Sequence, residues 1–230
     1  EHISIIMDGN RRYAADTGLA ATLGHRAGKE KLEDVMDWVL EIGVPYLTVY
    51  ALSTENITSR KPEELEALFD LYVEGLNDLA VDDRILNNKV KVQVAGRKDL
   101  LPERVLTAIE NTEKVTAEHD KFVFTVCLAY GSREEIIEAV RAIAADHADG
   151  NIDLESIDEA EISKRLWTGD MPDPDLVIRT SGEERISNFL LWQSAYAEYY
   201  FTDVYWPSFA RGDLLEAIEA YQQRKRRFGE

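Results

Sequence analysis

The chain has 230 residues, 45% of them hydrophobic and 30% charged, a composition that excludes an intrinsically disordered protein. Its formal net charge of −18 argues against a nucleic-acid-binding protein and against simple electrostatic attachment to anionic lipid, because both need clustered basic residues. No apolar run approaches the roughly 18 residues that a membrane-spanning helix needs, and no Pro-, Gly- or Ser-rich linker divides the chain, so we expect one domain over residues 1–230.

Strand-like apolar runs alternate with amphipathic, helix-like segments along the chain. The strand-like runs are ISIIM (3–7), YLTVYAL (46–52), KVKVQVA (89–95), KFVFTVCLA (121–129) and DLVIRT (175–180). The helix-like segments are residues 27–42, 62–80, 102–118 and 133–148. This order predicts an α/β domain with a mainly parallel sheet and helices on both faces. Proline at the first helical turn and glycine at the end support these boundaries, at Pro62, Pro102, Gly43 and Gly150.

The single cysteine, Cys127, lies in the fourth strand-like run. A buried thiol that acts as a small hydrophobic side chain is a better interpretation there than a nucleophile. One cysteine makes no disulfide within the chain, and we therefore expect a cytoplasmic protein.

An aspartate, Asp8, directly follows the first strand-like run and precedes glycine, asparagine and two arginines. A carboxylate beside apolar residues must be solvated, paired or bound to a metal. Ligands in open parallel sheets bind beyond the carboxyl ends of strands, so the segment from Gly9 to Arg12 fits a phosphate-binding turn. Neither G-x-G-x-x-G nor a P-loop motif is present. A salt-bridged structural turn is the alternative.

Polar residues follow the second and fifth strand-like runs in the same way. Those after the second run are Ser53, Glu55, Asn56 and Arg60, and those after the fifth are Arg179, Arg185 and Ser187. Two arginines close together after a strand favour an anionic ligand. Ser53 and Asn56 also have a structural interpretation, as caps of the next helix. Glu198 stands among aromatic residues and needs a cationic partner.

Five segments together resemble the cis-prenyltransferases, the undecaprenyl (polyprenyl) diphosphate synthase family. They are IIMDGNRRYA, GHRAGKEKL, YALSTEN, LVIRTSGEERISNFLLWQSAYAEYYFTDVYWPSF and the closing RRFG. The likeness covers nearly the whole chain in the right order, and the NRRYA variant is similar to the archaeal and eukaryotic branch.

The resemblance implies a parallel six-stranded sheet flanked by helices, with an apolar tunnel between sheet and helices. It implies a homodimer that condenses isopentenyl diphosphate successively onto an allylic diphosphate primer, farnesyl or geranylgeranyl diphosphate, with Mg2+. The product would be a medium- or long-chain cis-polyprenyl diphosphate, the precursor of a glycosyl carrier lipid. Release of such a product implies peripheral contact with the membrane.

Carried over by position, the resemblance implies catalytic roles for Asp8 and Asn56 and a metal site at Asp8 and Glu198. It implies substrate binding by Gly9, Asn10, Arg11, Arg12, Tyr13, His25, Ser53, Thr54, Glu55, Ile57, Arg60, Arg179, Arg185, Ile186, Ser187, Arg227 and Gly229. The last two match a C-terminal R-x-G motif that reaches the isopentenyl diphosphate site across the dimer.

Three positions depart from the family pattern. Ala21 replaces an arginine of many relatives, Glu184 replaces a histidine of bacterial ones, and Ile57 replaces an aromatic residue. Small Ala51 would leave the tunnel open and so favours a longer product. Two alternatives remain: a noncatalytic subunit of a heteromeric enzyme, and a short-chain synthase.

Overall fold

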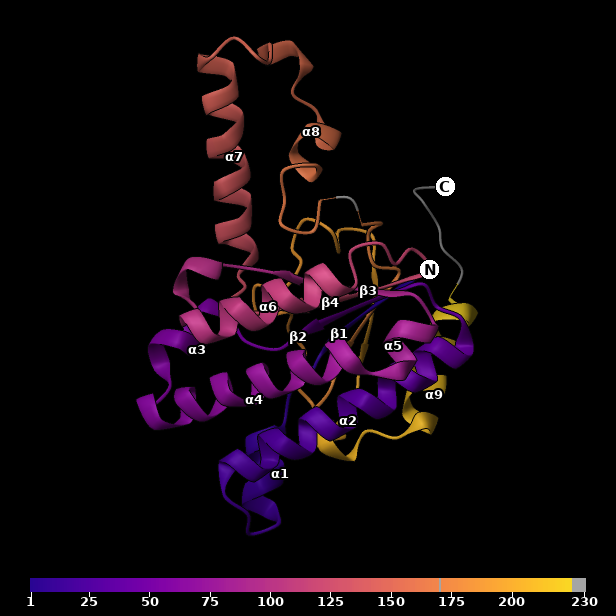
Figure 1. The fold of residues 1–230 in the computed structure, drawn as a ribbon. Helices are drawn as coiled ribbons and strands as arrows, with labels where there is room; N and C mark the ends of the chain where they lie inside the picture. Colours follow the sequence, from indigo (N-terminus) through magenta and orange to yellow (C-terminus); the bar gives the residue numbers. More distant parts are fainter. Residues whose placement is uncertain (170, 225–230) are drawn as a thin grey trace.

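A parallel sheet forms the centre of the structure, a computed structural model that describes residues 1–169 and 171–224 (Figure 1). Within these residues the sheet has six strands, in the order β3-β4-β2-β1-β5-β6, and all neighbours pair in parallel. The strands are β1 His2–Ile6, β2 Tyr46–Tyr50, β3 Val90–Ala95, β4 Phe122–Cys127, β5 Leu176–Arg179 and β6 Glu198–Phe201. The predicted α/β class and the six-stranded parallel sheet are thus confirmed, although apolar runs alone predicted only the first five strands.

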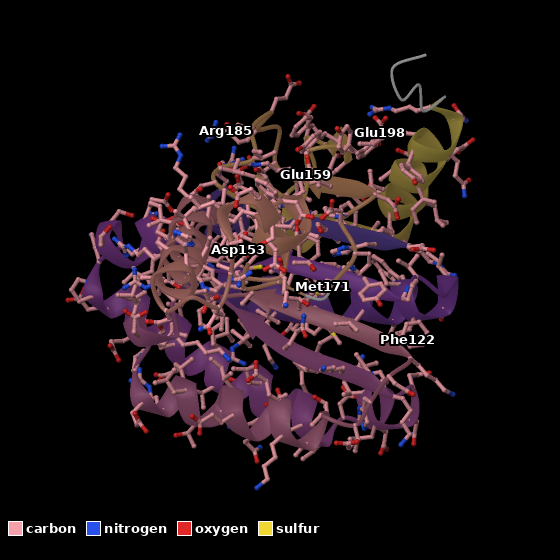
Figure 2. All side chains as sticks on the ribbon, turned by 90° about the horizontal axis from the view of Figure 1, so that it is seen from above. Phe122, Asp153, Glu159, Met171, Arg185 and Glu198 are labelled. Carbon is pink, nitrogen blue, oxygen red and sulfur yellow. The ribbon has the colours of Figure 1, made fainter. Side chains whose placement is uncertain are left out.

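Burial explains why the central strands are continuous apolar runs. All five residues of β1 and all four of β5 are buried, as expected for parallel strands that are covered on both faces. The strand starts form one edge of the sheet. Phe122 at the start of β4 and Glu198 at the start of β6 lie on the same side of the molecule (Figure 2). The carboxyl ends form the opposite edge.

Helices follow the strands in the alternating pattern that the sequence predicted. The longer ones are α1 Asn10–Asp16, α2 Ala21–Ile42, α4 Pro62–Val81, α6 Glu103–Val115, α7 Ser132–Ala148 and α9 Arg211–Gln223. Shorter turns are α3 Thr54–Ser59, α5 Asp83–Asn87, α8 Glu159–Ser163 and the 3-10 turns η1 Lys98–Leu100, η2 Leu154–Ser156 and η3 Trp206–Ser208. Helices α2, α4, α6 and α9 pack into the larger core, whereas α7 and α8 form an arm that projects from the sheet (Figure 1).

Helix α2 begins six residues before the predicted position. The prediction was wrong because Gly24 and Gly28 are poor helix formers, but their lack of a side chain lets α1 approach closely. A Cβ atom on Gly24 would lie 2.2 Å from the backbone oxygen of Asn10, and one on Gly28 would lie 2.4 Å from its Oδ1. Packing against Asn10 therefore requires both glycines.

Other sequence predictions match the structure directly. Pro62 occupies the first turn of α4, and Gly43 ends α2 in a left-handed conformation with φ 77°. Cys127 is fully buried, and burial raises the pKa of its thiol well above the ordinary value. Within residues 1–169 and 171–224, no helix combines the length and the apolar character that membrane crossing requires.

Candidate functional site

Three neighbouring strands bring the predicted polar residues to the carboxyl edge of the sheet. Asp8 follows β1, Ser53 follows β2, and Arg179 is the last residue of β5. Because β1 lies between β2 and β5, the three segments are adjacent. A cavity of about 900 Å³ opens there, which we call the polar cavity. Twelve of the predicted residues line it: Asp8, Gly9, Asn10, Arg11, Arg12, His25, Ser53, Glu55, Asn56, Arg60, Arg179 and Ser187.

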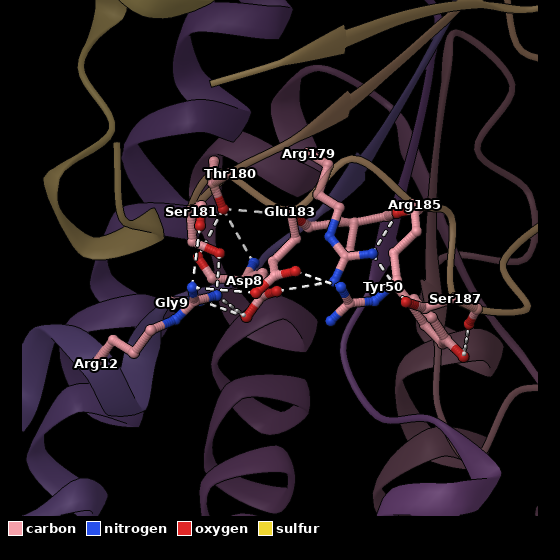
Figure 3. Close-up of polar contacts among 11 residues, drawn as sticks. Asp8, Gly9, Arg12, Tyr50, Arg179, Thr180, Ser181, Glu183, Arg185 and Ser187 are labelled. Atoms are coloured by element: carbon pink, nitrogen blue, oxygen red, sulfur yellow. Dashed lines mark hydrogen bonds and ion pairs between the residues drawn. The ribbon is translucent and has the colours of Figure 1, made fainter. Parts of the chain in front are cut away.

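Asp8 lies between Arg12 and Arg179 at the carboxyl edge of the sheet (Figure 3). Its carboxylate accepts a hydrogen bond of 2.9 Å from Arg179 Nη2 and one of 2.7 Å from the Gly9 N–H, and lies 3.3 Å from Arg12 Nη2. Burial raises the pKa of Asp8, but the hydrogen bond and charge of Arg179, the charge of Arg12 and the Gly9 N–H outweigh it. The pKa is therefore below its ordinary value, and Asp8 is ionised at neutral pH.

The backbone at Gly9 requires glycine. Its φ of +105° is one that side-chain-bearing residues rarely adopt. A Cβ atom there would also lie 2.9 Å from the ring of Tyr205 and 3.0 Å from Cβ of Ser181. Glycine thus allows the tight turn that directs the following residues, including Arg12, toward the cavity.

Arg12 is anchored by the loop after β5. Its Nη1 donates to the backbone oxygen of Ser181 at 3.0 Å, and its Nη2 donates to the hydroxyl of the same residue. The guanidinium also lies 3.4 Å from Glu183 and 5.8 Å from the ring centroid of Tyr205. Ser181 is held at a positive φ of 79°. The sequence analysis did not identify Ser181, because its role depends on a partner far away in the chain.

Arg179 is almost completely buried, with 4% of its surface exposed. Its Nη1 donates to Ser187 Oγ at 2.8 Å and to the backbone oxygen of Arg185, while Nη2 binds Asp8. Its Nε has no partner among the described residues. Since buried donors are usually hydrogen-bonded, an unpaired donor beside a cavity indicates room for an acceptor group.

A second charged cluster surrounds Glu64 on α4. Its carboxylate pairs with Arg60, lies 3.3 Å from His25 Nε2 and 3.8 Å from Arg11 Nε. Burial raises the pKa of Glu64, but the charge of Arg60, the His25 hydrogen bond and Arg11 hold it below its ordinary value. Burial and Arg60 lower the pKa of His25. Glu64 was not among the predicted site residues, although its spacing of four residues from Arg60 is typical of an ion pair on one face of a helix.

The turn after β2 combines capping with a position at the cavity. Ser53 caps α3, where its Oγ accepts a hydrogen bond of 3.2 Å from the Asn56 N–H. Glu55 accepts one of 3.2 Å from Asn188 Nδ2, which joins this turn to the loop after β5. The structural interpretation of Ser53 is therefore correct, and the same residue also lines the cavity.

Five predicted substrate-binding residues lie outside this lining: Tyr13, Thr54, Ile57, Arg185 and Ile186. Ile57 packs against the larger core and Ile186 against the smaller one. Arg185 is 62% exposed in its side chain and pairs with Glu183. In a single chain these three side chains thus face core or solvent.

Glu198 does not lie beside Asp8 within one chain. It begins β6 and pairs in register with Leu176, which in turn pairs with Ile3 at the start of β1. Asp8 is five residues after Ile3, just beyond the end of β1, or roughly 16 Å away at the rise of a strand. Glu198 instead accepts a hydrogen bond of 2.6 Å from Arg224. The expected metal pair is therefore not formed by one copy of the chain.

The remaining positions named from the sequence are two C-terminal residues and two departures from the family pattern. Arg227 and Gly229 lie outside the described residues. Ala21 is the first residue of α2, and Glu184 is exposed.

A second, mainly apolar cavity of about 230 Å³ lies between α2, α4 and the sheet, and we call it the apolar cavity. It shares lining residues with the polar cavity, so the two are contiguous: Met7, Asn10, His25, Tyr50, Ala51, Leu68 and Tyr72. Ala51 is thus at the junction, and its backbone oxygen accepts a hydrogen bond of 3.0 Å from Tyr72. The arrangement can hold an anionic group at one end and an apolar chain at the other.

Comparison with known proteins places this geometry in one family. A family model described as "Putative undecaprenyl diphosphate synthase" matches residues 6–229. A protein of Methanopyrus kandleri is 55% identical over 229 residues, which cover 100% of this chain and 84% of the relative. A protein of Thermoplasma volcanium is 48% identical over 228 residues, 99% of this chain and 88% of the relative. Both are named tritrans,polycis-undecaprenyl-diphosphate synthase (geranylgeranyl-diphosphate specific).

Solved structures agree with the relatives. Lavandulyl diphosphate synthase from Lavandula x intermedia, in complex with dimethylallyl diphosphate, superposes with a TM-score of 0.93 at 35% identity, over 100% of this chain and 98% of that one. A probable undecaprenyl diphosphate synthase from Campylobacter jejuni gives a TM-score of 0.80 at 28% identity, over the same shares.

Proposed function

The chain is a cis-prenyltransferase of the undecaprenyl diphosphate synthase family, and on this premise we propose that it condenses isopentenyl diphosphate repeatedly onto geranylgeranyl diphosphate. The primer is the one that the names of the archaeal relatives specify. The proposed product is a medium- or long-chain cis-polyprenyl diphosphate, a precursor of a glycosyl carrier lipid. The same names favour this product over the short-chain alternative.

The contiguity of the polar and apolar cavities is the observation that carries this proposal. A prenyl diphosphate has a dianionic head and an apolar tail, and each cavity suits one of these parts. Arg12 and Arg179 line the polar cavity, and guanidinium groups give the charge-assisted, forked hydrogen bonds that diphosphate oxygens accept. Leu68 and Tyr72 continue the wall toward the tail.

We assign a metal-binding role to Asp8. Mg2+ in phosphate-processing sites takes one or two carboxylates and completes its shell with phosphate oxygens and water. Asp8 is ionised and lines the polar cavity. In the part of the chain that the structure describes, there is no group of three or more His, Cys, Asp or Glu residues that could hold a metal ion by itself. One carboxylate plus a diphosphate fits this donor set. When bound, Mg2+ supplies neutralisation of the negative charge that develops on the departing diphosphate.

The remaining residues orient and stabilise the two substrates. Arg12 and Arg179 hold the leaving diphosphate by hydrogen bonds that strengthen as its charge grows. Arg60 also lines the polar cavity and has a buried Nε without a partner among residues 1–169 and 171–224, and we assign it to the diphosphate of the primer. Asn56 lines the cavity. We assign to it the role of accepting the proton that is lost as each new double bond forms. Juxtaposing the two substrates supplies much of the remaining rate.

A second copy of the chain completes the proposed site. Glu198 is at the far edge of its own sheet, and we assign it, together with Arg227 and Gly229, to the partner's site in a homodimer. Mixing inactive Asp8→Asn and Glu198→Gln proteins tests this assignment, because one of the two sites in a mixed dimer would contain both wild-type residues. Recovered activity supports sharing between subunits; two variants that stay inactive when co-refolded contradict it. We place the dimer in the cytoplasm, with peripheral membrane contact during release of the apolar product.

Turnover of labelled substrate tests the function itself. The purified protein is incubated with radiolabelled isopentenyl diphosphate, Mg2+ and either geranylgeranyl or farnesyl diphosphate, and dephosphorylated products are separated by length. A ladder of polyprenols with geranylgeranyl diphosphate is expected. Asp8→Asn should abolish it, whereas Asp16→Asn should not, because the Asp16 carboxylate at the end of α1 accepts a hydrogen bond of 3.0 Å from the Tyr205 hydroxyl and does not line the polar cavity. No incorporation by folded wild-type protein would instead support a noncatalytic subunit.

A further inference from the structure

An ion-pair cluster joins α2 to α4 beside the apolar cavity. Lys29 on α2 lies 3.3 Å from Glu33 on its own helix, and 3.4 Å from Glu74 and 2.6 Å from Asp78 on α4. Only 17% of the Lys29 side chain is exposed. We call these four residues the Lys29 cluster. It offers one ammonium group to three carboxylates at a half-buried position.

The Lys29 cluster forms part of the wall of the apolar cavity. Lys29, Glu33 and Asp78 all line this cavity, together with the charged pair Asp82 and Arg84 and apolar residues such as Leu32 and Leu79. Charged side chains are unusual in a wall that would contact an apolar tail. The Lys29 cluster and Arg84, which lies 3.7 Å from Glu33, thus form one charged stretch in a mainly apolar wall.

Gly75 on α4 lies beside the stem of the Lys29 side chain. A Cβ atom on Gly75 would lie 3.4 Å from Cε of Lys29, the closest contact there. The lysine stem therefore lies beside α4, where its ammonium group pairs with Glu74 and Asp78.

The position of Lys29 separates it from the diphosphate end. It lies four residues, or about 6 Å, beyond His25 along α2, and His25 lines both cavities. Lys29 lines the apolar cavity but not the polar one. A growing tail would therefore reach Lys29 only after its head and first units were bound.

An apolar tail that passes Lys29 would exclude water from an ammonium group and its carboxylates. Removing an ion pair from water is costly unless its remaining hydrogen bonds are satisfied, and a hydrocarbon offers none. We infer that Lys29 determines the product length by limiting how far the tail extends along the apolar cavity. This inference rests on the proposed function, and it names a specificity-determining residue outside the diphosphate site.

Substitution of Lys29 by methionine tests this inference, because methionine keeps an unbranched stem without the charge. Product lengths are compared for wild type, Lys29→Met and Lys29→Met combined with Asp78→Leu, using labelled isopentenyl diphosphate and geranylgeranyl diphosphate. Lys31→Met is the matched control: Lys31 is on the same helix, 19% exposed, paired with Asp34 at 2.7 Å, and outside the cavity lining.

The expected result is a shift of the main product by at least one isoprene unit toward longer chains in the double variant, because Lys29→Met alone leaves the Asp78 carboxylate in the wall without its ammonium partner. The KM for the primer should stay within about twofold of wild type, since Lys29 does not line the polar cavity. Lys29→Arg should keep the wild-type lengths, and Lys31→Met should do the same. Unchanged or shorter products from the double variant would overturn the inference, whereas a wild-type protein that makes no polyprenol would overturn the proposed function.

Discussion

Buried polar side chains have complete hydrogen bonds at the amino edge of the sheet and incomplete ones at the carboxyl edge. His2, at the start of β1, is 1% exposed, and its Nδ1 and Nε2 lie 2.7 Å from the Pro172 oxygen and 2.8 Å from Thr48 Oγ1. At the carboxyl edge, the buried Nε atoms of Arg60 and Arg179 have no partner within the described ranges. We infer that the fully hydrogen-bonded groups at the amino edge stabilise the fold, whereas the unpaired arginine donors at the carboxyl edge are available to a ligand.

The largest expected effect is the loss of kcat in Arg179→Gln, which changes the carboxyl edge. Loss of one preorganised donor to a developing charge costs about 100- to 1000-fold in kcat. Steady-state kinetics with both substrates measures it. Arg97→Gln is the control, because Arg97 also follows a strand but pairs at the surface with Asp99. Comparable losses in both variants would contradict the distinction between the two arginines.

The second-largest effect should be a loss of unfolding free energy in acid, caused by His2 at the amino edge. Burial lowers the pKa of His2 to about 4, so its neutral form stabilises the fold above pH 6.5. As pH falls from 6.5 to about 4, the unfolded chain binds a proton that the folded chain does not, and roughly 3 kcal/mol of unfolding free energy is lost. Urea unfolding at several pH values measures this slope. His2→Gln should flatten it, and an unchanged slope in this variant would contradict the role of His2.

Gly9→Ala should affect both folding and activity, by a smaller amount. A positive φ and a Cβ contact of 2.9 Å with Tyr205 predict a cost of about 1–3 kcal/mol, with loss of turnover because the Asp8 turn is distorted. Gly18→Ala also has a positive φ, of 73°, but no atom within 4 Å of the added Cβ. Thermal unfolding and turnover of the two variants should differ; equal behaviour would mean that backbone strain alone explains the effect.

Ser181→Gly should produce the smallest effect. It removes the hydroxyl that accepts from Arg12 but relieves the positive φ of 79°. We expect a rise of roughly 2- to 10-fold in the KM for the allylic primer, equivalent to one hydrogen bond, and no loss of thermal stability. A fall in the unfolding midpoint with KM unchanged would show that Ser181 stabilises the fold and does not position Arg12.

Local patterns were sufficient for much of the fold and for the centre of the site. The five apolar runs and the position of Asp8 after the first run follow from period and order alone, and the parallel arrangement then brings Arg179 to the same edge. Strand β6 was missed by pattern because its four residues are only half-buried and carry no long apolar run.

Features that depend on distant partners could not be read from the pattern. The placement of Glu198 follows from the register of β6 on β5, which no local signal specifies. The start of α2 depends on Asn10 packing against two glycines. Glu64 acquires its partners His25 and Arg11 from another part of the chain.

The central place of β1 has a consequence for the order of folding during synthesis. β1 can pair with β2 once Tyr50 has been made, but its other neighbour, β5, begins only at Leu176. While the residues between β2 and β5 are being made, one edge of β1 is therefore open, with backbone N–H and C=O groups that can pair with another chain. The segment from Leu176 to Arg179 protects the nascent protein from association as well as completing the site.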